Sequence, residues 1–402
     1  MTRRALAASV AVTALTALVL TGCVAKSELA EAIPVDLSDD ACTVGVSTAG
    51  AGAVTFALEN TGTDVNEFEI LADDKLRIVG EKENVTPGQQ VEFTAQLQPG
   101  TYYTACKFQQ VGAPIGLAKF TVTGEQAAVS SDEQQLADQA VAEYLAYVRS
   151  QVAELLPLVQ QLADAYAAGD DATARSLFAA ARVPYERIEP TAEAFGDLDP
   201  KIDFREVDAV ADGLDWTGFH RIEKDLWAPQ PGDLNSDGQD ALQGWSPSTP
   251  EQRQGFADGL VADVTELHDL VTADDFAVSL ADISNGAIAL LDEVASGKIT
   301  GEEDWWSGTD LSDFAANVQG AGVAFGAVRA LAESKGDEGA ALAEEIEGQF
   351  AALEEALAVH GSLDAGFADY ATLTDADMKA LSDQVNALAE PLSQLTSTVL
   401  GV

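Results

Sequence analysis

The sequence predicts a multidomain protein in which a small all-β sandwich is followed by all-α helical bundles. Short alternating segments separated by Gly, Asn and Pro-Gly turns fill residues 41–124, whereas helical periodicity dominates residues 125–402. A chain of 402 residues is longer than one ordinary domain, and its 47% hydrophobic content is sufficient for globular cores.

Residues 1–22 have the features of a signal peptide. The basic start MTRR precedes the apolar stretch ALAASVAVTALTALVL, which is short for a membrane span. The segment ends in LTGC, which resembles the lipobox of bacterial lipoproteins, so Cys23 is the expected lipidation site and first mature residue. An ordinary secretion signal that contains a cysteine is the alternative. Both interpretations place the mature protein outside the cytoplasm, and the first anchors it to the cell membrane.

Residues 23–40 are polar and acidic and are expected to form a tether. The sandwich follows, with strand-like segments such as GAVTFALENTG, NEFEIL, QVEFTAQL, TYYTACKF and LAKFTVTG. It contains no histidine, which excludes a blue-copper site of two His and one Cys. In an oxidising compartment, Cys42 and Cys106 are expected either to form a disulfide or to serve as thiolate ligands.

The helical domain, residues 125–402, begins with the long periodic segment QLADQAVAEYLAYVRSQVAELLPLVQQLADAYAAGD. Further periodic segments indicate two joined bundles, interrupted by a loop-rich stretch at 228–250. Within that stretch, DLNSDGQD (233–240) resembles the start of a calcium loop. Its twelfth position is Gly244 instead of a bidentate Glu, so a solvated turn is favoured.

The formal net charge is −46, from 67 acidic and 21 basic residues. Such a surface repels the phosphates of nucleic acids and anionic lipid headgroups, and it attracts cations. The charge therefore excludes a nucleic-acid partner, but it does not by itself prove a metal site.

The phrase FHRIE at 219–223 suggests a metal-binding helix. At 100° per residue, His220 and Glu223 border the apolar arc of a helix, and the spacing i, i+3 lets both reach one point. The remaining charged residues of this helix are expected to face water; they are Arg221, Lys224 and Asp225.

A second copy of the phrase, YERIE at 185–189, gives Glu186 and Glu189 the same angles on another helix, which Pro190 is expected to kink or end. Together the two copies supply three carboxylates and one imidazole, a set that suits iron or manganese in a bundle. A hydrogen-bonded core His220 is the alternative, although inward carboxylates without a cation would be costly. The zinc-peptidase motifs need a second His at the spacing of H-E-x-x-H or its inverse, and neither motif occurs in the sequence.

The blocks PYERIEPTAEAFGDLDPKIDFRE, GFHRIEKDLW, GKITGEEDW and TDLSDFAANVQGA resemble the imelysin-like domain of EfeO-type iron-uptake proteins. The order of a lipoprotein signal, a cupredoxin-like domain and an imelysin-like domain is also similar, over nearly the whole mature chain. The resemblance implies an extracytoplasmic protein that binds iron, as Fe2+ or Fe3+, without turnover. It also implies two partners, a ferric permease and a haem-dependent peroxidase.

The resemblance further implies a metal cluster around the H-x-x-E motif, which maps to Glu186, Glu189, Asp203, His220, Glu223 and Glu303. Asp203 is implied by the resemblance alone, and Glu302 is a lower-ranked neighbour of Glu303. Pro184 and Gly308 stand where relatives often carry His, so outer ligands of the relatives are missing here.

For the cupredoxin-like domain, the resemblance implies metal binding at Glu67. Cys42, Cys106 and Glu67 are therefore a second candidate metal site, for copper or another divalent metal, and a disulfide remains the alternative. Thr101 stands where relatives carry Glu.

Two other functions compete with iron binding. The peptidase label attached to imelysin-like domains suggests a metallopeptidase, which needs a metal-bound water and a general base in an open cleft. A binder of polysaccharides or other solutes would use surface aromatics along a groove between the bundles. One His with an excess of carboxylates favours a holding site for a hard cation over either alternative.

Overall fold

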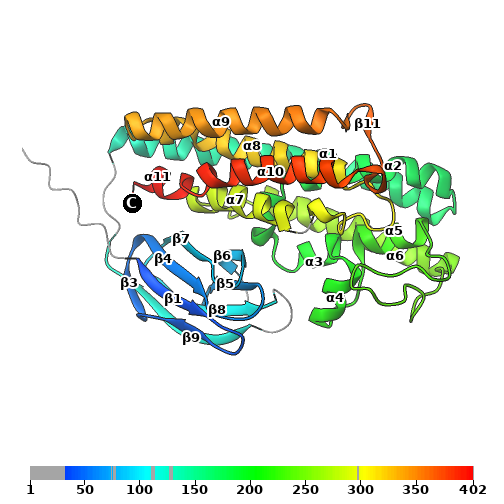
Figure 1. Ribbon diagram of the computed structural model, residues 1–402, viewed down its shortest axis with the longest axis horizontal. Coiled ribbons are helices and arrows are strands. Elements are labelled where there is room, and N and C mark those ends of the chain that lie inside the picture. Colours follow the sequence, from blue (N-terminus) through cyan, green and yellow to red (C-terminus); the bar gives the residue numbers. More distant parts are fainter. Residues whose placement is uncertain are drawn as a thin grey trace, which may run out of the picture. The chain divides into compact units, whose positions relative to one another are not determined.

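The computed structural model describes residues 32–401, except for residues 74, 76–77, 110–113, 126–129 and 297 (Figure 1). The predicted signal peptide, Cys23 and the first part of the predicted tether lie outside the described residues. As predicted, a β-sheet region comes first and a helical region follows. In the described part of the chain, no helix is both long enough and apolar enough to cross a membrane.

The β-sheet region consists of two sheets with the strand orders β2-β1-β4-β7 and β3-β9-β8-β5-β6. The two sheets share one core, in which Phe56 of the first sheet contacts Phe68 and Phe120 of the second. The strands are β1 (Ile33–Leu37), β2 (Cys42–Val44), β3 (Thr48–Gly50), β4 (Gly52–Asn60), β5 (Asn66–Leu71), β6 (Ile78–Val85), β7 (Gln90–Leu97), β8 (Gly100–Phe108) and β9 (Ile115–Thr123).

Strand β1 lies in the segment that the sequence analysis assigned to the acidic tether. Its sequence IPVDL alternates, so that Ile33, Val35 and Leu37 are buried while the residues between them are exposed. It pairs in parallel with β4 and antiparallel with β2. The tether prediction was therefore wrong for residues 33–37, because the acidic composition of the whole segment concealed one short amphipathic strand.

Capping boxes start several of the long helices in the helical region. Ser130 and Glu133 form a capping box at the start of α1, and Thr249 and Gln252 form another at α6. The helices are α1 (Ser131–Ala167), α2 (Asp171–Glu186), η1 (Glu189–Phe195), α3 (Leu198–Asp203), α4 (Glu206–Asp212), α5 (Gly218–Leu226), α6 (Pro250–Thr272), α7 (Leu280–Ser296), η2 (Lys298–Thr300), α8 (Asp310–Glu333), α9 (Asp337–Ala358), η3 (Tyr370–Thr372), α10 (Asp375–Leu392) and α11 (Leu395–Leu400).

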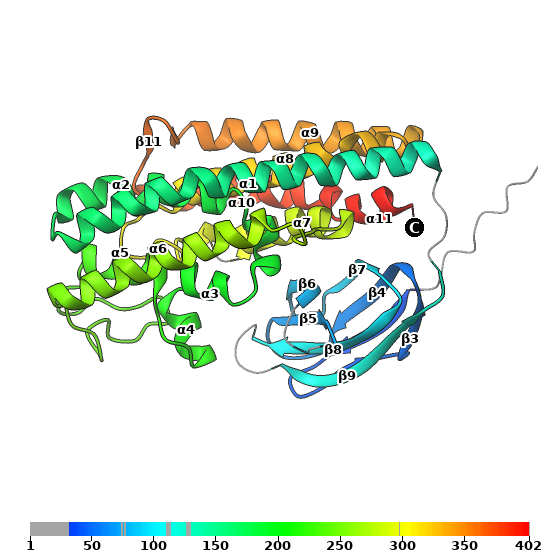
Figure 2. The same cartoon turned by 180° about the vertical axis from the view of Figure 1, so that it is seen from behind.

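Helix α1 packs against α2, α6 and α8, and the long helices run alongside one another in both views (Figures 1 and 2). Buried side chains from α1 through α11 form one continuous core, rather than the cores of two joined bundles. The region is not purely α-helical, because β10 (Gly361–Ser362) and β11 (Gly366–Phe367) form a short antiparallel ladder.

Candidate metal centre

A close backbone approach brings α5 against the end of α3. Gly218, the first residue of α5, has φ of 79°, and a Cβ at this position would lie 2.2 Å from the carbonyl oxygen of Ile202. Only glycine fits this conformation and this contact without strain. The approach places Asp203, the last residue of α3, beside His220 on α5, with 3.5 Å between Asp203 Oδ1 and His220 Nε2.

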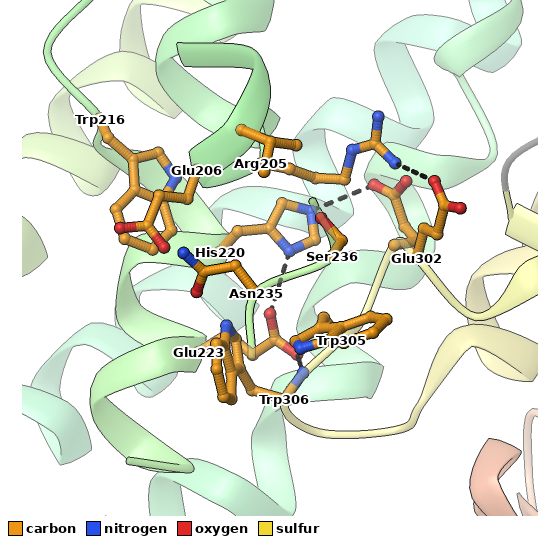
Figure 3. Close-up of a pocket in the computed structure, with 12 residues that line it drawn as sticks. Arg205, Glu206, Trp216, His220, Glu223, Asn235, Ser236, Glu302, Trp305 and Trp306 are labelled. Atoms are coloured by element: carbon orange, nitrogen blue, oxygen red, sulfur yellow. Dashed lines mark hydrogen bonds and ion pairs between the residues drawn. The ribbon is translucent and has the colours of Figure 1, made fainter. Parts of the chain in front are cut away.

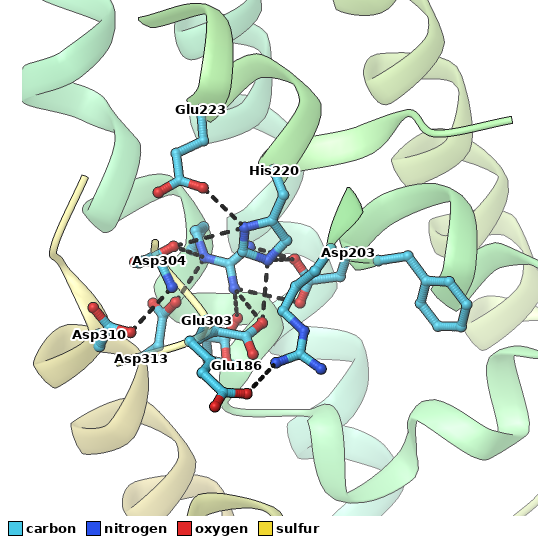
Figure 4. Close-up of polar contacts among 12 residues, drawn as sticks. Glu186, Asp203, His220, Glu223, Glu303, Asp304, Asp310 and Asp313 are labelled. Carbon is cyan, nitrogen blue, oxygen red and sulfur yellow. Dashed lines mark hydrogen bonds and ion pairs between the residues drawn. The ribbon is translucent and has the colours of Figure 1, made fainter. Parts of the chain in front are cut away.

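His220 is buried and uses both ring nitrogens (Figure 4). Its Nδ1 lies 3.2 Å from Glu223 Oε2, and its Nε2 lies 3.1 Å from Glu303 Oε1. The other oxygen of Glu223 accepts hydrogen bonds from the backbone amides of Trp306 and Ser307, at 3.0 and 2.8 Å. The predicted H-x-x-E pair is thus tied to the loop between η2 and α8, which carries Glu303.

The prediction that the charged residues Arg221 and Lys224 of α5 face water is wrong. Lys224 is fully buried, where it donates to Glu206 and, at 2.9 Å, to Asn235 Oδ1. Arg221 is also buried, paired with Asp225 at 2.9 Å. The prediction from helical periodicity failed because it treated α5 without its neighbours. The loop-rich stretch 228–250 and α6 cover the face of α5 that was expected to be solvent-exposed.

Glu186 and Glu189 do not share one helix, contrary to the prediction. Helix α2 ends at Glu186 and Glu189 begins the 3-10 helix η1, because Pro190 disfavours the α conformation at the residue before it. Asn317 on α8 nevertheless holds the two carboxylates together. Its Nδ2 donates to Glu186 Oε2 at 3.0 Å and to Glu189 Oε2 at 2.6 Å.

All six candidate residues of the helical domain converge. Together with Asp304, which the sequence analysis did not select, they fall into three overlapping groups in which the possible ligand atoms lie within 4.8 Å of one another: Asp203, His220 and Glu303; His220, Glu223 and Asp304; and Glu186, Glu189 and Asp203. Six carboxylates and one imidazole therefore surround one region of the helical core.

Glu302 points elsewhere. Its carboxylate is half-exposed and lies 3.5 Å from Nη1 of Arg205, where it lines a small cavity of ≈ 20 Å³ together with His220 and Glu223 (Figure 3). Trp305 and Trp306 line the same cavity.

Sequence reasoning missed three buried aspartates of this centre, Asp304, Asp310 and Asp313. The amide of Asp304 donates to Asp310 Oδ1 at 3.1 Å, and the hydroxyl of Thr309 donates to Asp304. Asp310 and Asp313 lie in the first turn of α8, where acidic residues commonly serve only to complement the helix dipole. The sequence carried no signal that would distinguish them from such residues.

Arg182, one turn before Glu186 on α2, was missed as well. Its guanidinium is fully buried and lies among the carboxylates. The Nε atom donates to Asp313 Oδ2 at 2.8 Å, Nη2 donates to Glu186 Oε1 at 2.6 Å, and Nη1 donates to Asp203.

Burial and crowding shift the titration of the cluster. Burial raises the pKa of Asp203 to about 7, against the opposing effect of Arg182, and burial also raises the pKa of Asp310 to about 7. Burial and Arg182 favour neutral His220, but hydrogen bonds to Glu223 and Glu303 outweigh them and raise the pKa of His220 to about 10. The acids are short of compensating positive charge, even with Arg182 and an imidazolium beside them.

The cluster fits a hard cation. Asp304 Oδ1 is buried and has no hydrogen-bond partner among the described residues, although it lies 3.6 Å from Nε of Arg182. A cation at this position would supply the missing partner, and carboxylate oxygens with one imidazole are donors that iron and manganese accept.

In the β-sheet region, Cys42 and Cys106 form a disulfide with an S–S distance of 2.03 Å. Glu67 does not lie with them. Phe68 is directly opposite Cys106 in the β5–β8 pair, so the neighbouring Glu67 points to the other face of the sheet. The proposed thiolate site therefore does not form.

Glu67 instead lies near Glu81 and Glu83 of β6, with possible ligand oxygens within 4.8 Å of one another. Burial raises the pKa of Glu67 well above its usual range, and the negative charges of Glu81 and Glu83 add to this shift.

Comparison with known proteins identifies both regions. The imelysin family matches residues 140–395, and a cupredoxin-like domain matches residues 9–116. A relative in Yersinia pestis, "Iron uptake system component EfeO", is 39% identical over 373 residues, which is 92% of this chain and 91% of the relative. A protein of the same name in Escherichia coli O6:H1 is 36% identical over 374 residues and 92% of each chain. A solved imelysin-like protein from Psychrobacter arcticum, 12% identical, covers 69% of this chain and 99% of its own length with a TM-score of 0.47. The chain therefore belongs to the EfeO family of iron uptake system components, with a cupredoxin-like domain followed by an imelysin domain.

Proposed function

We infer that the chain is an iron-binding component of an iron uptake system, which holds iron at the carboxylate–histidine centre of its helical domain without turnover. The convergence of six carboxylates and one imidazole supports this inference most directly. Removing these groups from water without a cation would be costly, and a hard cation offsets that cost. The names of the relatives, iron uptake system components, agree with iron as the cargo.

The six residues first selected from the sequence are the proposed ligand set, and Asp304 is added as a seventh candidate. Each could offer one oxygen or nitrogen atom to an ion in this region. Asp310 and Asn317 would hold the ligands rather than bind the ion, because Asp310 accepts from the Asp304 amide and Asn317 holds Glu186 and Glu189. Asp313 pairs with Arg182 instead.

The remaining steps of uptake are proposed from family membership alone. The mature chain would be extracytoplasmic and anchored to the cell membrane through lipid on Cys23. From there it would deliver iron to a ferric permease, alongside a haem-dependent peroxidase. A Cys23→Ala variant should leave the membrane fraction or remain unprocessed. Unchanged fractionation and unchanged acyl labelling would refute the anchor.

A metallopeptidase is the less favoured function. The other possible ligands around His220 are carboxylates, and the described residues place no second histidine beside it. Such a site lacks the nitrogen-rich, open coordination at which a zinc hydrolase activates water.

Metal analysis of the chain purified without chelator, with peptidase assays in parallel, tests this function. Bound iron and no peptide hydrolysis are expected. A chain that binds no iron under any redox condition would refute the proposal, and zinc-dependent hydrolysis would favour the peptidase.

A further inference from the structure

Arg182 occupies an unusual place for an arginine. It is fully buried, and a buried cation of this kind is costly unless it is closely paired. Its position four residues before Glu186 on α2 points its side chain along the same helical face, into the cluster.

The guanidinium contacts five carboxylates. Besides its hydrogen bonds to Glu186, Asp203 and Asp313, Nη2 lies 3.5 Å from Glu303 Oε1 and Nε lies 3.6 Å from Asp304 Oδ1. Glu186, Asp203, Glu303 and Asp304 all belong to the proposed ligand set. The positive charge of Arg182 therefore lies where a metal ion would gather the same oxygens.

The two cations cannot use these oxygens equally well at the same time. An ion that bound Glu186, Asp203 and Glu303 would bring its charge close to the guanidinium, and like charges repel strongly where water is scarce. Arg182 has a position to which it can withdraw, because Nε donates to Asp313 Oδ2, outside the proposed ligand set.

We propose that Arg182 is the resident counter-cation of the metal-free centre and competes with the incoming iron for Glu186, Asp203 and Glu303. Binding of the ion moves the guanidinium off these three carboxylates while Nε keeps its contact with Asp313. Arg182 thereby stabilises the empty centre and limits the affinity for the ion, which makes a carried ion releasable. This inference rests on the proposed function.

A purely structural role for Arg182 predicts the opposite effect on affinity. If the guanidinium only held the ligand carboxylates in position, its removal would weaken metal binding, as loss of a supporting group usually does, by about 10–100-fold. If it competes, its removal tightens binding while the metal-free protein loses stability. The sign of the affinity change therefore separates the two roles.

The test measures anaerobic Fe2+ binding and thermal unfolding for the full chain and for Arg182→Gln. We expect Arg182→Gln to bind Fe2+ at least about tenfold more tightly, because the ion no longer has to displace the charge-assisted hydrogen bonds of the guanidinium. Without metal, the variant should have a lower melting temperature than the unaltered chain, and Fe2+ should raise its melting temperature by more. Arg182→Lys keeps the positive charge but loses the planar, multidentate guanidinium. Its Fe2+ affinity should lie between those of the unaltered chain and Arg182→Gln. Unchanged or weaker binding by Arg182→Gln would overturn the inference.

Arg329→Gln is the matched control. It removes one positive charge as well, but Arg329 lies on the surface, paired with Glu333 and Glu347. Its affinity for Fe2+ should equal that of the unaltered chain.

Crystal structures of the unaltered chain, grown without metal and with Fe2+, test the inference even if the Arg182 variants do not fold. The distance from Arg182 Nη2 to Glu186 Oε1, 2.6 Å here, should lengthen beyond hydrogen-bonding range when Fe2+ is bound. An unmoved guanidinium beside bound Fe2+ would overturn this inference alone. Failure of the unaltered chain to bind Fe2+ would overturn the proposed function and this inference together.

Discussion

Nδ1 of His220 lies 3.2 Å from Oε2 of Glu223, one turn further along α5. The pair is the meeting point of two separate parts of the helical domain. Glu223 is fixed by the amides of Trp306 and Ser307, and Nε2 of His220 reaches Glu303. A local i, i+3 spacing is thereby joined to a loop more than eighty residues away.

The double variant His220→Ala, Glu223→Ala should lose Fe2+ binding. It removes the only imidazole of the cluster and the carboxylate beside it. Ligand binding stabilises the folded state by RT ln(1 + [L]/Kd), or about 2.7 kcal/mol at a hundredfold excess over Kd. The metal-dependent rise in melting temperature should therefore disappear while helix content, measured by circular dichroism, is retained.

The control for this variant is His268→Ala, Asp269→Ala. This pair, 3.6 Å apart, also joins a histidine to a carboxylate, but both residues are on the surface of α6. Iron binding should be unchanged. If the His220 and Glu223 variant binds Fe2+ as tightly as the unaltered chain, the proposed centre is wrong.

Asn317→Ala should weaken Fe2+ binding without abolishing it. The amide of Asn317 holds Glu186 and Glu189 on adjacent helices, and loss of such an outer contact typically costs 10–100-fold in metal affinity. Gln319→Ala, two residues along the same helix and exposed, is the control. Equal affinities for the two variants would show that Asn317 does not position the ligands.

The sequence could predict the His220 and Glu223 pair because their relationship is local. Both residues lie within one turn of one helix, and helical periodicity alone makes them neighbours. The same periodicity failed for Glu186 and Glu189. Pro190 disfavours the α conformation at Glu189, so the α-helix ends at Glu186 and the two residues do not share one helix. Their proximity instead depends on Asn317, from a distant helix.

The burial of Arg182 and Lys224 could not be predicted from the sequence, because the periodicity of a single helix assigns charged residues to its solvent-facing side. Each would be solvated on a two-helix surface, but each is fully buried here by further elements that pack around it. In the β-sheet region, period-2 alternation separates Glu67 from Phe68, but the alternation alone does not say which residue faces Cys106. That depends on the register between β5 and β8.

Reduction of the Cys42–Cys106 disulfide should destabilise the β-sheet region. The bond joins residues 64 apart in the sequence, and removal of a native disulfide typically costs about 2–4 kcal/mol. In a chain carrying Cys23→Ser, thiol titration should find no free thiol in the native state. Chemical denaturation with and without reductant measures the destabilisation.

Iron binding in the helical domain should be unaffected by Cys42→Ser, Cys106→Ser, because neither cysteine is part of the carboxylate–histidine centre. Free thiols in the native chain, or loss of Fe2+ binding at this centre in the double serine variant, would contradict this separation.

Fe2+ affinity should fall as the pH decreases through 7. Burial raises the pKa of Asp203 from 3.8 to about 7, and contacts with Glu223 and Glu303 raise that of His220 from 6.5 to about 10 despite its burial. Both groups must lose their protons to bind an ion. Each displaced proton costs about tenfold in affinity per pH unit below the pKa of its group.

The metal-free protein should respond to pH in the opposite direction. A folded-state pKa above the unfolded value means that the folded chain binds the proton more tightly, so the contribution to stability is lost as the pH rises. The pKa values set the pH range of this loss of stability: for Asp203 it occurs between pH 3.8 and about 7, and for His220 between pH 6.5 and about 10. Melting temperatures measured across this range, with and without Fe2+, should therefore diverge as the pH increases. Asp203→Asn should bind Fe2+ more weakly but with a shallower pH dependence, and an affinity that is constant between about pH 5 and 8 would exclude proton competition at this centre.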